Sequence, residues 1–111
     1  MDENNVKIAD EVVAVVSGVA AMEVEGVAGM SSTLVGGIAE LLGKKNLSKG
    51  VKITMGEGYT EIEVFIIVDY GCKMPDVGAA VQQRVKETVE SMTGLNVIAV
   101  NVNIEGIKLP M

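Results

Sequence analysis

The sequence predicts an α+β fold, in which a small mixed sheet of three to four strands carries its helices mainly on one face. Residues 51–68 form two runs of alternating apolar and polar side chains around a glycine-rich turn, the pattern of a β-hairpin. Residues 75–92 then place apolar side chains at helical spacing, and a further alternating run follows at 98–104. A strand–helix–strand crossover of this length makes the last strand parallel to the strand before the helix.

The first half of the chain predicts two helices and one short strand. Apolar residues at helical spacing run from Ile8 to Met22, and early acidic residues suit the positive end of the helix dipole. The valine-rich run also suits a strand, but its alanines favour a helix. The apolar stripe of this helix consists of Ile8, Val12, Val15, Val16 and Val19. Residues 24–30 predict an edge strand with a glycine bulge, and residues 34–42 a helix weakened by Gly36 and Gly37.

The second half predicts the hairpin, a long helix and a last strand. The turn lies at residues 56–59, and the apolar face of the second hairpin strand consists of Ile62, Val64, Ile66 and Val68. Pro75 suits the start of the helix and Gly94 its end. Its apolar stripe is formed by Val77, Val81, Val85, Val89 and Met92, and the residues expected to face solvent are Gln82, Gln83, Lys86, Glu87 and Glu90. Residues 106–111 are expected to form a short tail.

The composition indicates one cytoplasmic domain with an unusually apolar surface. We expect a single domain over residues 1–111, with a core at about 8–107. The mean hydropathy is +0.39, yet no apolar run reaches the ~20 residues of a membrane-spanning helix, and the acidic N-terminus is unlike a signal peptide. The excess apolar surface is therefore expected to be shared with copies of the chain or with a partner. The net charge of −6 argues against nucleic-acid binding.

The residue types argue against enzyme chemistry, a metal or a cofactor. The chain has no histidine, the commonest metal ligand and general base. Its one cysteine, Cys72, precedes a helix N-terminus and Lys73, but without a base an ordinary loop thiol is the favoured interpretation. Glu61 and Glu63 share a strand face opposite Lys52 and are interpreted as solvated cross-strand partners. We therefore expect no catalytic residues.

Two features are candidate interfaces. Phe65 and Ile67 lie on the hairpin face opposite the apolar one, and an exposed apolar patch there would mark a protein contact. In the alternative, the first helix or the N-terminal segment covers them. The second candidate is a loop with Lys44, Lys45 and Lys49, which would bind anionic lipid or an acidic partner, or would simply be solvated.

Eight short motifs follow one another along the chain, at residues 8–13, 25–30, 47–53, 68–71, 75–77, 81–86, 90–95 and 100–106. As an ordered set they resemble the motifs of a known family, the alkaline-shock or envelope-stress-response proteins of Gram-positive bacteria. The resemblance covers nearly the whole chain, although Cys72 and its two following residues depart from the usual loop. It implies a cytoplasmic protein that associates with itself, or that lies near the membrane through a membrane-anchored partner, with no catalytic residue.

Residues and resemblance together predict a non-enzymatic stress-response protein that acts as a self-associating or partner-binding module. The alternative function is a nucleic-acid-binding or small-ligand-sensing α+β module. The acidic balance and the 3% aromatic content, which leaves few rings for stacking on bases, argue against the nucleic-acid alternative.

Overall fold

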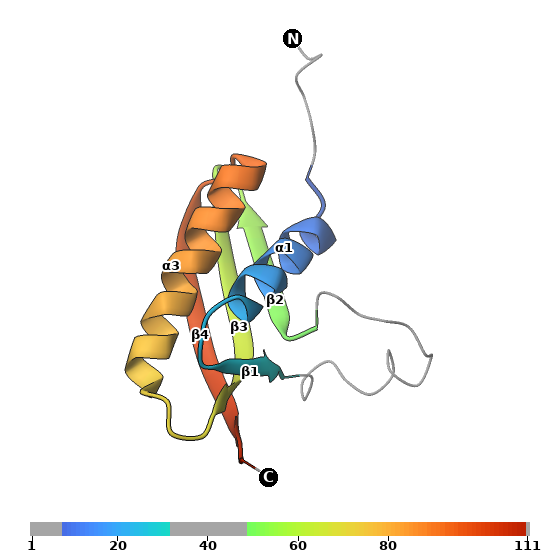
Figure 1. The fold of residues 1–111 in the computed structure, drawn as a ribbon. Helices are drawn as coiled ribbons and strands as arrows, with labels where there is room; N and C mark the ends of the chain where they lie inside the picture. Colours follow the sequence, from blue (N-terminus) through green and yellow to red (C-terminus); the bar gives the residue numbers. More distant parts are fainter. Residues whose placement is uncertain (1–7, 32–48, 111) are drawn as a thin grey trace, which may run out of the picture.

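A computed structural model describes residues 8–31 and 49–110 of the chain. The elements in chain order are α1 (Asp10–Met22), β1 (Val27–Met30), β2 (Val51–Gly56), β3 (Tyr59–Asp69), α3 (Met74–Thr93) and β4 (Val97–Lys108) (Figure 1). The helix predicted at residues 34–42 lies outside the described residues. The α+β fold and the other elements agree with the sequence prediction.

The four strands form one mixed sheet with β3 in its centre. β1 and β2 are both antiparallel to β3 and share one of its edges, one after the other. β4 is parallel to β3 along the other edge, which confirms the predicted crossover through α3. The hairpin turn consists of Glu57 and Gly58, and Gly58 has a φ of 79°, which favours glycine at this position of a tight turn.

Both described helices pack on the same face of the sheet, α1 over the β2 side and α3 over the β4 side (Figure 1). The core between these layers contains fully buried side chains of β3 and of α3, among them Ile62, Val64, Ile66, Val68, Val81, Val85 and Val89. Each such side chain contributes roughly 1.5–3 kcal/mol when it leaves water. The alternation of β3 and the four valines of the α3 stripe therefore meet as predicted. Met92, the last residue of the predicted stripe, is 69% exposed instead, in the last turn of the helix.

α1 presents a different face to the core from the one that its periodicity indicated. Its buried residues are mostly small: Val13, Ala14, Ser17, Gly18, Ala20 and Ala21. Val12 and Val19, which belong to the predicted apolar stripe, are exposed instead. Small inward side chains let a helix lie close to the elements beneath it, and Ser17 is satisfied locally because its Oγ donates to the carbonyl of Val13 at 2.8 Å.

β4 is longer than predicted, because it continues through Gly106 to Lys108. Two register shifts accommodate it against β3. The partners of Thr60 and Glu61 are Val97 and Ala99, and the partners of Ile66 and Ile67 are Ile104 and Gly106, so one residue is extra at each place. The expected tail is therefore partly strand.

Candidate interaction surfaces

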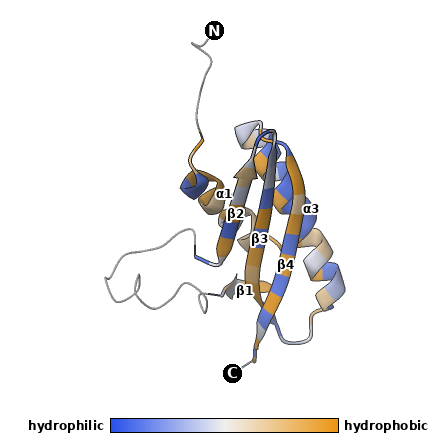
Figure 2. Ribbon diagram, turned by 180° about the vertical axis from the view of Figure 1, so that it is seen from behind, coloured by the Kyte–Doolittle hydropathy of each residue, from blue (hydrophilic) through white to orange (hydrophobic). Residues whose placement is uncertain are grey.

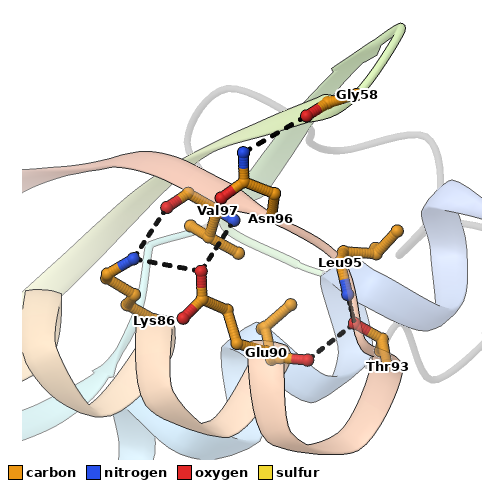
Figure 3. A network of polar contacts seen from close by, with 8 residues as sticks. Gly58, Lys86, Glu90, Thr93, Leu95, Asn96 and Val97 are labelled. Atoms are coloured by element: carbon orange, nitrogen blue, oxygen red, sulfur yellow. Dashed lines mark hydrogen bonds and ion pairs between the residues drawn. The ribbon is translucent and has the colours of Figure 1, made fainter.

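The free edge of β4 is covered at its start by polar side chains of α3. The Nζ of Lys86 donates to the Val97 carbonyl at 2.9 Å and to Glu90 Oε2 at 3.0 Å. The Val97 N–H donates to the same Glu90 oxygen, also at 3.0 Å, so both backbone groups of Val97 are satisfied (Figure 3). These hydrogen bonds lower the pKa of the Glu90 carboxyl, first through the Val97 N–H and then through Lys86, while desolvation opposes them.

One turn earlier on α3, Gln82 continues the same pattern. Its Nε2 donates to the Val100 carbonyl at 3.0 Å. Gln82, Lys86 and Glu90 are each four residues apart, so they lie on one side of the helix and follow β4; we call them the edge row. Gln82 and Lys86 are exposed, as expected, and Glu90 is half-buried. All three also bind the sheet edge, because the parallel crossover brings this side of α3 beside it.

The loops at this end of the sheet are fixed by further polar contacts. The hydroxyl of Thr93 donates to the Val89 carbonyl at 2.6 Å and accepts the Leu95 N–H at 3.1 Å, which holds the chain as it leaves α3 (Figure 3). Asn96 Nδ2 donates to the Gly58 carbonyl at 3.2 Å and ties the start of β4 to the hairpin turn. The start of β4, to which the edge row binds, is therefore held in place by several polar contacts.

Figure 2 shows the sheet face opposite α1 and α3, here called the open face. Phe65 and Ile67 lie on this face, because they alternate along β3 with core residues such as Ile66 and Val68. Phe65 is only 9% exposed and is not part of the core between helices and sheet, so of the two alternatives left open by the sequence, exposure does not hold for Phe65. Its place in the central strand explains this, because Asn103 lies across one ladder and the backbone of Gly50 across the other. Ile67 is half-buried. A role for either residue in an interface stays a prediction.

The hairpin end of the open face is polar. Lys52 lies opposite Glu63 in the β2–β3 ladder, and a hollow of about 110 Å³ is lined by Lys52, Thr54, Glu61, Ile62, Glu63 and Asn101. Asn103 Nδ2 donates to Glu63 Oε2 at 3.1 Å. Two carboxylates on this face make it unfavourable for a phosphate backbone.

α1 carries a row of exposed apolar side chains outside the core. Val12, Val19 and Met22 are 49%, 52% and 45% exposed, and they follow one another along the helix; we call them the outer stripe. Val15 and Val16, between them in the helix, are half-buried. Because the opposite side of α1 is buried as well, the helix is apolar nearly all round, which is typical of helices covered on both sides.

The remaining sequence candidates are placed only in part. Lys44 and Lys45 lie outside the described residues, and Lys49 is half-buried beside β2. Cys72 is half-buried after β3, and its N–H donates to the Asp69 carbonyl at 3.2 Å. Within residues 8–31 and 49–110, no three acidic or cysteine side chains converge in the manner of a metal site. Neither of the described helices has the length and apolar character needed to cross a membrane.

Comparisons with known proteins identify a family and several relatives. The model of the alkaline shock protein 23 family, described as having a cell envelope-related function, matches residues 1–109. YqhY of Bacillus subtilis is 40% identical over 103 residues, which cover 93% of this chain and 76% of YqhY. YloU of the same species is 38% identical over 106 residues, covering 94% and 88% of the two chains. A stress response regulator gls24 homolog of Streptococcus pyogenes is 27% identical over 100 residues, covering 89% of this chain and 56% of that protein.

Solved structures share the fold at low sequence identity. A copper form of the MamM CTD has a TM-score of 0.55 and 15% identity, with 88% of this chain and 98% of that chain covered. A manganese form also gives 0.55, with 14% identity over 88% and 99% of the two chains. These neighbours support the fold assignment alone.

Proposed function

This chain belongs to the alkaline shock protein 23 family, and we propose that it serves the envelope- and stress-related role of that family as a non-enzymatic protein-interaction module. In this proposal the chain lies in the cytoplasm and associates with itself or with a membrane-anchored partner. Such a partner would bring it close to the membrane.

The outer stripe of α1 is the observation that carries this proposal. Burying an apolar side chain stabilises a complex by roughly 25 cal/mol per Å² of surface removed from water. Val12, Val19 and Met22 keep about half of their surface in water, on a helix whose charged residues lie only in its first turn. A soluble domain rarely leaves a row of apolar side chains exposed unless a second protein covers it.

The distribution of polar groups also favours binding over catalysis. The lowered pKa of Glu90 has a structural cause, its hydrogen bonds to the Val97 N–H and to Lys86. Strongly shifted groups in a cleft are the usual mark of acid–base catalysis. Glu90 instead accepts a backbone hydrogen bond at the edge of the sheet.

Polar replacement of the outer stripe tests the proposal. Val12→Gln with Val19→Gln keeps helix propensity and removes the apolar surface, so the variant should fold. Wild-type and variant chains would be compared by light scattering over a wide concentration range, and by affinity capture from native cells. We expect the variant to lose self-association, or to lose a protein that the wild-type chain retains.

Met92→Gln is the matched control, because Met92 is an exposed apolar residue on the other helix, at 69%. This variant should behave as the wild-type chain does. The proposal is wrong if the wild-type chain stays monomeric at high concentration and retains no protein that the double variant fails to retain.

A further inference from the structure

Along β4, residues whose backbone groups bond to β3 alternate with residues whose backbone groups point away from the sheet. In β3, Phe65 donates to Gly50 and accepts from Ser31, both at 2.8 Å, so the odd-numbered residues of β3 direct their backbone groups to β1 and β2. The even-numbered residues of β3 therefore direct their backbone N–H and C=O groups to β4. In a parallel ladder, the residue opposite such a position directs both of its groups outward. In β4 these outward residues are Val97, Val100, Val102, Ile104 and Ile107.

The edge row covers only the first part of this edge. It satisfies both groups of Val97 and the carbonyl of Val100. The position four residues before Gln82 is Gly78, which has no side chain to continue the row. Within the described part of the chain, no hydrogen bond reaches the outward groups of Val102 and Ile104. These two residues thus form an open strand edge.

An apolar groove lies beside this open edge. Its volume is about 320 Å³, and it is lined by Met74, Pro75, Gly78, Ala79, Gln82, Val102 and Ile104. A Cβ built on Gly78 would meet nothing within 4 Å, so the glycine leaves open space here and does not relieve a crowded contact. Open backbone groups beside an apolar groove are the arrangement that binds an added strand, since the backbone gives affinity and the groove takes side chains.

We propose that a second copy of this chain adds its β4 to this edge, antiparallel, around a twofold axis at Asn103. This inference rests on the self-association part of the proposed function and adds a second contact between copies, at β4, to the outer stripe of α1. Val102 would exchange both hydrogen bonds with Ile104 of the partner subunit, and Ile104 with the partner's Val102. Those pairs satisfy the backbone groups of the two open residues. They leave the hydrogen bond from Gln82 to the Val100 carbonyl intact.

A second copy fits this edge because the open stretch is complementary to itself: in the antiparallel register its two open residues, Val102 and Ile104, pair with each other across the twofold axis. The net charge of −6 makes two copies repel each other over most of their surface, so a contact between them needs a stretch with few charges. β4 has only two charged residues, Glu105 and Lys108, and in this register Glu105 lies opposite the partner's Asn101. The open stretch also lacks the lysine or proline that protects sheet edges. The apolar side chains of Val102 and Ile104 from both copies would meet beside the grooves.

Gly78→Gln tests the proposal by extending the edge row. The new side chain has room, reaches toward the open edge as Gln82 does, and improves helix propensity. We expect the dissociation constant of the dimer to rise at least about tenfold, measured by analytical ultracentrifugation. The melting temperature of the monomer should rise by a few degrees. Ala80→Gln adds the same side chain to an exposed position on another side of α3 and should leave the dimer unchanged.

A cross-link tests the register. In the proposed dimer Asn103 faces the partner's Asn103 in a non-hydrogen-bonded pair, with Cα atoms about 4.5 Å apart, within reach of a disulfide. In a Cys72→Ser background, Asn103→Cys should form a dimer under mild oxidation, while Asn101→Cys should not.

The outcomes separate the two proposals. A wild-type dimer that survives Gly78→Gln and gives no Asn103→Cys cross-link overturns the β4 edge as the contact, while self-association itself stands. A wild-type chain that is monomeric at every concentration overturns both the β4 contact and the self-association part of the proposed function.

Discussion

Gly26 joins α1 to β1 at a point where a side chain is excluded for two separate reasons, and Gly26→Ala should destabilise the fold strongly. Its φ is 102°, a conformation that residues with a Cβ rarely adopt. A Cβ built there would lie 2.7 Å from Cγ2 of Val77, a buried residue in the first turn of α3. The Gly26 carbonyl also accepts the Asp69 N–H at 2.9 Å, so the backbone cannot easily move away.

The two penalties have different sizes and can be separated. The unfavourable φ costs about 1–2 kcal/mol. Overpacking against the buried Val77 costs about 1–3 kcal/mol. The free energy of unfolding should therefore fall by about 2–5 kcal/mol, a large share of the roughly 5–15 kcal/mol of an ordinary domain. In a Val77→Ala background the overlap disappears, and Gly26→Ala should then cost only the first 1–2 kcal/mol.

Urea denaturation of the four chains of this double-mutant cycle measures both terms. Val77→Ala alone should cost about 2 kcal/mol through two lost methyl groups and a small cavity. If Gly26→Ala is equally destabilising in both backgrounds, Val77 does not cause the overlap penalty. A total loss below about 1 kcal/mol in the wild-type background would contradict both arguments.

Three further changes test other parts of the fold by urea denaturation. The Val97 N–H lowers the pKa of Glu90, so its carboxylate stabilises the folded state above the ordinary pKa of 4.5, and this stabilisation is lost as the pH falls through the lower folded value. The difference between wild type and Glu90→Gln should therefore shrink in acid, and a constant difference would contradict this assignment. Ile66→Ala, at a fully buried position of the central strand, should cost about 2–5 kcal/mol. Thr93→Val removes the acceptor of the Leu95 N–H and should cost about 1 kcal/mol; no change would mean that water replaces it.

The sheet and the long helix were predictable because their sequence patterns admit one solution. The alternation of β3 distinguishes two faces, and only the face with Ile62 and Val68 is apolar throughout. Pro75 and Gly94 bound a helix with a single valine stripe, and Gly94 adopts the expected left-handed conformation with a φ of 77°. The parallel crossover to β4 then follows from connection length alone.

The orientation of α1 was not predictable from periodicity, because both of its sides satisfy helical spacing. Counting bulky residues selects the side with Val12 and Val19, which the structure leaves exposed. The side with Ser17 and Gly18 is buried instead, since close packing on the layer beneath it requires small side chains. The spacing of small residues was the available signal. For Phe65, burial depends on neighbours in three strands, which no local pattern contains.

The contacts of the edge row on α3 were also not predictable from periodicity, and these contacts bear on function. Gln82, Lys86 and Glu90 resemble a solvated helix face, because a sequence pattern does not show that a sheet edge runs beside them. Once β4 is placed, each polar group finds a backbone partner, and the interruption of the row at Gly78 becomes informative. Edges that are left open tend to recruit another strand. A chain that satisfies the start of an edge and leaves the next residues open beside an apolar groove therefore has a defined place for a second strand.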